Sequence, residues 1–127
     1  MSVVLLVDDN LTIRNVIKIY LMGMDFAFLE ADRAESALEQ LRANKVDLII
    51  ADVNMPGMDG ITFLRRVRED VRTQVKGLPV ILLTADKSGD VRERGRLAGA
   101  SHFIAKPVTS TELRGTVVQC LGLTLKK

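Results

Sequence analysis

Five short runs of apolar residues place the strongest constraint on what this chain can fold into. Most of them lack the alternation of apolar and polar residues that marks a strand with one solvated face. Unbroken apolar runs of this length are typical of strands buried on both faces, as in a parallel sheet covered by helices. The runs span Val3–Val7, Phe26–Leu29, Leu48–Ala51, Val80–Leu83 and Phe103–Ala105.

Segments with helical periodicity separate these runs. One has apolar residues spaced i, i+3, i+4 and i+7 between positions 34 and 41, and Asp32 is its expected N-cap. Another begins with a capping box formed by Thr109 and Glu112. The segment Ser88–Ala98 is the weakest helix, because each of its glycines costs about 1 kcal/mol relative to alanine. The alternation predicts an α/β fold with a five-stranded parallel sheet and five helices.

Length and composition fit one globular domain, residues 1–127. The chain is 47% hydrophobic and 27% charged, which allows a sizeable core and argues against disorder. A net charge of only +2 gives no bulk attraction to nucleic acid or to membranes. The single cysteine, Cys120, fits a reducing compartment, and no apolar stretch is long enough to span a bilayer. We therefore expect a cytoplasmic protein.

Polar side chains follow four of the apolar runs. Ligands of an open parallel sheet bind beyond the carboxyl ends of its strands, so these side chains should meet at one edge of the sheet. Crowded carboxylates repel one another, and a hard cation such as Mg²⁺ or Mn²⁺ relieves that repulsion. A carboxylate can also attack a phosphoryl donor, while an ammonium and a hydroxyl bind the phosphoryl oxygens. The residues are Asp8 and Asp9, Asp52, Thr84 and Lys106.

The residues alone leave the identity of the nucleophile open. Asp8 and Asp9 are adjacent and could both orient a metal ion, whereas Asp52 stands alone before a turn-rich stretch. We favour Asp52 for that reason. Aspartates also cap helices and form turns, but three of them after two buried strands exceed what capping requires.

Four motifs together resemble the receiver domain of bacterial two-component response regulators. The resemblance covers essentially the whole chain and is most like the single-domain chemotaxis regulators. It implies a flavodoxin-like, doubly wound sheet with strand order 2-1-3-4-5, an order for which the chemotaxis regulator is itself a standard example. The motifs are Asp8-Asp9, the stretch Asp52-Val53-Asn54-Met55-Pro56-Gly57-Met58-Asp59-Gly60, Thr84-Ala85 and Lys106-Pro107.

The resemblance also implies a role for each residue at the metal and phosphoryl site. Asp52 is the expected phosphoryl acceptor. Asp9 and Asp52 are expected to bind Mg²⁺ directly, together with the backbone carbonyl of Asn54. Asp8 is expected to act mostly through metal-bound water. Thr84 is expected to hold the phosphoryl oxygens.

Further roles follow from the same resemblance. Lys106 is expected to bind the phosphoryl oxygens beside Thr84, before a cis peptide bond to Pro107. Phe103 is the expected aromatic switch residue. Asn54 and Asp86 are expected to tune the rate of dephosphorylation.

The expected partners are proteins. A histidine kinase or phosphotransfer protein would donate the phosphoryl group, and the chain would catalyse only its own phosphorylation and dephosphorylation. A downstream protein would bind the face formed by the Ser88–Ala98 helix, the last strand and the Thr109–Leu121 helix. We expect no direct nucleic-acid or membrane binding, and a monomer or a weak phosphorylation-linked dimer. The charges expected on this face are those of Lys87, Arg92, Arg94 and Arg114.

Two alternatives use the same residues differently. A phosphohydrolase of the haloacid dehalogenase type also needs Asp, Thr, Lys and Mg²⁺, but its Asp-x-Asp motif usually closes the first strand, where this chain has Asp8-Asp9-Asn10. Turnover of a small phosphate ester would favour that enzyme. An interaction module that is never phosphorylated is the second alternative, and failure to bind Mg²⁺ would favour it.

Overall fold

The computed structural model describes residues 1–86 and 88–122. Its centre is a five-stranded sheet in the order β2-β1-β3-β4-β5, in which all neighbouring strands are parallel. This confirms the predicted strand order. The strands are β1 (Ser2–Val7), β2 (Phe26–Ala31), β3 (Leu48–Asp52), β4 (Val80–Thr84) and β5 (His102–Ala105).

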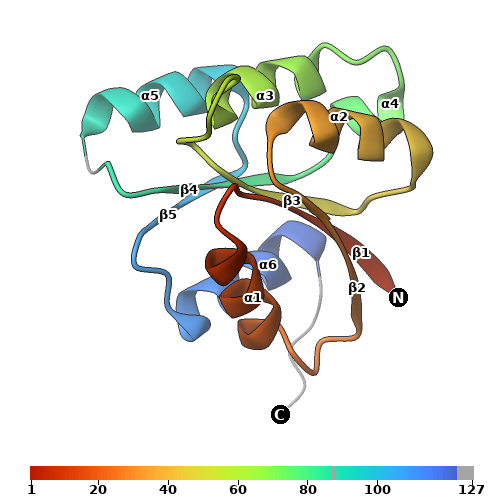
Figure 1. Ribbon diagram of the computed structural model, residues 1–127, viewed down its shortest axis with the longest axis vertical. Helices are drawn as coiled ribbons and strands as arrows, with labels where there is room; N and C mark the ends of the chain where they lie inside the picture. Colours follow the sequence, from red (N-terminus) through yellow and green to blue (C-terminus); the bar gives the residue numbers. More distant parts are fainter. Residues whose placement is uncertain (87, 123–127) are drawn as a thin grey trace.

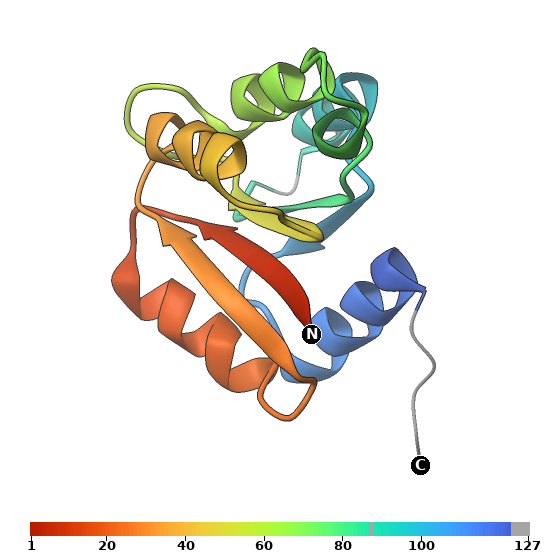
Figure 2. The ribbon, with the colours of Figure 1, turned by 90° about the vertical axis from the view of Figure 1, so that its right-hand side faces the viewer.

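Helices cover both faces of the sheet. α1 and α6 lie on one face, and α2, α3 and α5 lie on the other (Figure 1). The view along the sheet in Figure 2 shows the three layers, with the sheet between the two groups of helices. The helices are α1 (Leu11–Tyr20), α2 (Ala34–Ala43), α3 (Gly60–Arg68), α4 (Thr73–Lys76), α5 (Gly89–Ala98) and α6 (Ser110–Leu121).

The sheet separates two apolar clusters, which explains the unbroken apolar runs. Successive side chains of a strand point to opposite faces, so Leu5 packs under α2 and α3 while Leu6 packs under α1 and α6. Both leucines are fully buried, as is every residue of β3 and β4. A polar residue within these strands would have no water on either side. The polar side chains are therefore confined to the strand ends, where the site is built.

Two sequence expectations about the helices were wrong. The described residues contain a sixth helix, α4, which is a single turn in a polar segment and too short to show a periodic pattern. The N-cap of α2 is Arg33, without a side-chain hydrogen bond, so Asp32 does not cap it. Thr109 does cap α6, because its side chain accepts a hydrogen bond from the Glu112 N–H.

None of the described helices is both long and apolar enough to cross a bilayer.

The cis peptide bond between Lys106 and Pro107 is present, as expected.

Candidate metal and phosphoryl site

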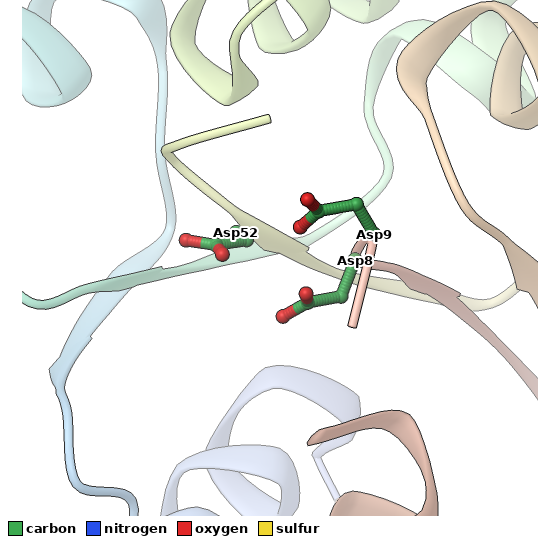
Figure 3. Close-up of side chains that lie close together, drawn as sticks. All are labelled: Asp8, Asp9 and Asp52. Carbon is green, nitrogen blue, oxygen red and sulfur yellow. The ribbon is translucent and has the colours of Figure 1, made fainter. Parts of the chain in front are cut away.

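Three aspartates meet at the carboxyl ends of β1 and β3. These strands are neighbours in parallel register, with Val7 opposite Ala51, so the next residues, Asp8 and Asp52, lie side by side. Asp9 follows Asp8 and turns toward the same space (Figure 3). One carboxylate oxygen from each of the three lies within 4.8 Å of the others. The predicted acidic cluster is therefore present.

The three carboxylates differ in their exposure to water. Asp8 is 2% exposed and Asp52 is 5% exposed, whereas Asp9 is exposed. The backbone N–H of Asn10 donates to Oδ1 of Asp8 (2.9 Å), but Oδ2 of Asp8 is buried and has no hydrogen-bond partner. Burial raises the pKa of Asp8 to about 6, and the negative charges of Asp52 and Asp9 add to this rise.

Lys106, just beyond β5, supplies the positive charge at the cluster. Its ammonium lies 2.9 Å from Oδ2 of Asp52 and 3.9 Å from Oδ2 of Asp8. One ammonium cannot neutralise three carboxylates, so the site keeps a net negative charge. The unpartnered Oδ2 of Asp8, beside the carboxylates of Asp9 and Asp52, fits Mg²⁺, which prefers oxygen ligands and retains several waters.

The turn after β3 fixes the carboxylate of Asp52. The backbone N–H of Asn54 donates to Oδ1 of Asp52 (3.2 Å), and the N–H of Gly60 donates to the carbonyl of Val53 (2.8 Å). A Cβ atom at Gly60 would overlap the backbone of Asp52, so glycine is required where α3 approaches the strand end. The sequence reasoning did not assign this role to Gly60, although its place after Asp59, the N-cap of α3, was a usable signal.

Thr84 lies at the end of β4 and is fully buried. Its hydroxyl accepts a hydrogen bond from the N–H of Asp86 (3.0 Å) and donates one to the carbonyl of Asp86 (3.3 Å). Asp86 itself is exposed, and its carboxylate accepts a hydrogen bond from the N–H of Ser88, which lowers the pKa of Asp86. In this conformation the Thr84 hydroxyl is therefore bound to its own loop.

Phe103 on β5 is half-buried beneath α5. A Cβ atom at Gly95 would overlap the Phe103 ring, so α5 can lie over this ring only because position 95 is glycine. The guanidinium of Arg92 lies 5.8 Å from the ring centroid, within the range of a cation–π interaction. Gly95, which the sequence marked as a weakness of the helix, is thus a packing requirement.

The structure corrects one residue of the predicted partner face. Arg114 is half-buried, and its guanidinium donates to the backbone carbonyls of Tyr20 (2.9 Å) and Met22 (3.1 Å) at the end of α1. Arg92 and Arg94 are both exposed on α5, and Arg92 lies against Phe103 of β5. Lys87 lies outside the described residues.

Comparison with known proteins identifies relatives over nearly the whole chain. Residues 4–118 match the family model described as the response regulator receiver domain. The chain is 39% identical to the chemotaxis protein CheY of Pseudomonas aeruginosa over 112 residues, which cover 87% of this chain and 89% of that protein. It is 36% identical over 110 residues to the transcriptional regulatory protein ResD of Bacillus subtilis, and the match covers 87% of this chain and 44% of that longer protein.

Solved structures agree with these relatives. The chemotaxis protein CheY4 of Vibrio cholerae superposes with a TM-score of 0.87 at 32% identity, covering 95% of this chain and 99% of that one. The receiver domain of the Francisella response regulator 1452 superposes with a TM-score of 0.85 at 29% identity, covering 96% of this chain and 98% of that one.

Proposed function

Because this chain belongs to the family of response regulator receiver domains, we propose that it is a switch in which Asp52 accepts a phosphoryl group. The observation that carries the proposal is the charge arrangement around Asp52. Two further carboxylates lie within 4.8 Å of it and the Lys106 ammonium lies 2.9 Å from it. A histidine kinase or phosphotransfer protein is the proposed donor.

The proposed step is an in-line transfer to a carboxylate oxygen of Asp52. An O–P bond forms as the N–P bond to the donor imidazole breaks, and the imidazole leaves with the bonding electron pair. The Lys106 ammonium, which binds Oδ2 of Asp52 in this structure, is proposed to bind a phosphoryl oxygen after the transfer and to neutralise part of its charge. Mg²⁺ or Mn²⁺ held by Asp9, Asp52 and the backbone carbonyl of Asn54, with Asp8 acting through water, would supply the remaining charge neutralisation.

The signal is proposed to end when the phosphoryl group is hydrolysed from Asp52. A water attacks the phosphorus, the O–P bond to Asp52 breaks, and inorganic phosphate and the free carboxylate are the products. Asn54 and Asp86 are exposed on the two loops that follow β3 and β4. Their side chains are proposed to set how easily this water approaches. The chain would then act only on its own phosphoryl group and would not turn over a separate substrate.

The switch is proposed to pass through Thr84 and Phe103. The Thr84 hydroxyl must give up its hydrogen bonds to the Asp86 backbone to reach a phosphoryl oxygen. Its movement frees space beside β4, and Phe103 can turn into that space from its place beneath Gly95. Because a close-packed core favours discrete arrangements, α5 and β5 would shift between two states. A downstream protein would read the α5, β5 and α6 face, in one state more tightly than in the other.

Mass spectrometry tests the acceptor. After incubation with Mg²⁺ and a small acyl phosphate, the protein should gain one phosphoryl group, and Asp52→Asn should gain none. Glu30→Gln is the control, because Glu30 is a partly buried carboxylate on β2 and should not affect labelling. Labelling of the Asp52→Asn protein to the same extent would contradict the assignment. Hydrolysis of a small phosphate ester with many turnovers would favour a phosphohydrolase instead.

A further inference from the structure

Two adjacent helices contain much of the positive charge of this chain. α3 and α5 pack against each other on one face of the sheet (Figure 1). Together they contain six arginines and only two acidic residues, Asp90 and Glu93, whereas the whole chain has a net charge of +2. The charge of this pair of helices is therefore unbalanced, and the rest of the molecule is net acidic.

Hydrogen bonds show which flank of α3 faces α5. The guanidinium of Arg68 donates to the carbonyl of Gly99 at the end of α5 (3.1 and 2.8 Å) and to the carbonyl of Leu78 before β4 (2.6 Å). Arg68 is thus used to hold the two helices together. Arg65 is three residues earlier on the same helix, so it lies on the same flank, but it is exposed.

Arg94 and Leu97 lie on the flank of α5 that faces α3. Arg92 turns toward β5, because its guanidinium lies against Phe103. Arg94 is two residues further along, about 200° around the helix, so it lies on the flank toward α3. Leu97 is three residues beyond Arg94 and is 70% exposed. We call Arg65, Arg94 and Leu97 the α3–α5 ridge.

The two cations of the ridge have no intramolecular partner among the described residues. Glu93, the nearest glutamate in sequence to Arg94, is bound to Arg96 through two hydrogen bonds of 2.9 and 2.7 Å. Like charges on facing flanks repel, and an anionic ligand between them relieves that repulsion. Arginine is enriched at protein interfaces, and covering the exposed Leu97 with an apolar side chain of a partner would remove apolar surface from water.

We infer that the α3–α5 ridge binds an acidic protein segment, whose carboxylates pair with Arg65 and Arg94 and whose apolar side chain covers Leu97. A single-stranded nucleic acid fits less well, because it needs aromatic platforms for its bases, and Phe63, the one aromatic residue of the two helices, is buried. The ridge lies on the side of α5 away from β5. The inference does not depend on phosphorylation of Asp52.

Fluorescence anisotropy can test the inference with a labelled peptide that carries Asp and Glu around one central Leu. We expect the unmodified protein to bind it, and we expect Arg65→Glu combined with Arg94→Glu to weaken binding about tenfold or more. Leu97→Ser should weaken it to a similar extent, and a peptide with Ser in place of its Leu should show the same loss. Arg42→Glu is the matched control, because Arg42 is exposed on α2 and its change alters the charge in the same direction.

Several outcomes would overturn the inference. An equal loss in Arg42→Glu would mean that the peptide follows overall charge alone. Equally tight binding of an oligonucleotide, unaffected by Leu97→Ser, would identify a nucleic-acid surface instead. Absence of peptide binding, or NMR shift changes confined to β5 and α6, would also contradict it. All four substituted side chains are exposed, so the variants should keep the fold, which circular dichroism can confirm.

Discussion

The carboxylate of Glu30 and the three carboxylates at the ends of β1 and β3 have opposite electrostatic surroundings. Glu30, on β2, is bound by two cations, since Arg14 lies 2.9 Å from Oε1 and Lys18 lies 2.8 Å from Oε2. Hydrogen bonds from Lys18 and Arg14 lower the pKa of Glu30. The aspartate cluster has one ammonium for three carboxylates, and the pKa of Asp8 is raised to about 6.

The contrast separates a structural ion pair from a binding site. Glu30 is satisfied within the chain, so it links β2 to α1 and offers nothing to a ligand. The aspartate cluster has one ammonium for three carboxylates and a buried oxygen without a partner, so an added cation gains more there than at Glu30. Charged groups that lack partners are a cost to the folded protein, and such costs are concentrated at functional sites. Three predictions test this contrast, from the largest effect to the smallest.

Mg²⁺ should stabilise the protein through the aspartate cluster. A ligand that binds only the folded state at a hundredfold excess over its Kd stabilises by about 2.7 kcal/mol, which corresponds to a rise in Tm of roughly 10 °C for a chain of this size. Asp9→Asn should remove most of this rise, measured by differential scanning calorimetry. Glu30→Gln should keep it in full. A Tm that does not respond to millimolar Mg²⁺ in the unmodified protein would mean that the cluster is not a metal site.

The metal-free protein should become more stable as the pH falls from 7 toward 5. Between the ordinary pKa of aspartate and the raised pKa of Asp8, the folded state holds a proton that the unfolded chain has lost. The free energy of unfolding therefore decreases as the pH rises, by about 1 kcal/mol between pH 5 and pH 7 from this group. Urea titrations in the presence of a chelator can measure this.

Asp8→Asn supplies the control for the pH effect. An amide cannot titrate, so the variant should be more stable than the unmodified protein at pH 7 and should lose about half of the difference at pH 5. Equal pH dependence in the two proteins would show that burial of Asp8 is not its cause.

The sequence predicted the strand ends well, but not the differences among the residues at those ends. Unbroken apolar runs fixed where β1 and β3 stop, and the order of a parallel sheet then brought Asp8 and Asp52 together. The sequence alone does not show that Asp8 is buried while Asp9 is exposed, because burial depends on contacts between distant segments. The hydrogen bonds from Arg114 to the end of α1 are likewise long-range contacts, which local periodicity cannot predict.

The role of Gly95 shows the same limit in a helix. Intrinsic propensity correctly counts glycine as unfavourable in α5, but it carries no information on Phe103, which approaches from a different strand. The four residues of α4 are too few for any pattern to predict.

The smallest predicted effect concerns Glu30. Its contribution to stability should decrease as the pH falls, whereas that of Asp8 should increase. A lowered pKa contributes stability that is complete above the ordinary pKa of glutamate and is lost as the pH falls through the lowered value. Glu30→Gln should therefore cost at most about 1 kcal/mol at pH 7, since both cations are partly exposed, and the difference from the unmodified protein should vanish in acid. The Asp8→Asn protein lacks the stabilisation that protonation of Asp8 gives at low pH. Its free energy of unfolding should therefore only decrease as the pH falls. NMR titration of the Glu30 carboxyl carbon can follow the group directly. A pKa at or above the ordinary glutamate value would remove the contrast on which all three predictions depend, because Glu30 would then be as unsatisfied as the aspartate cluster.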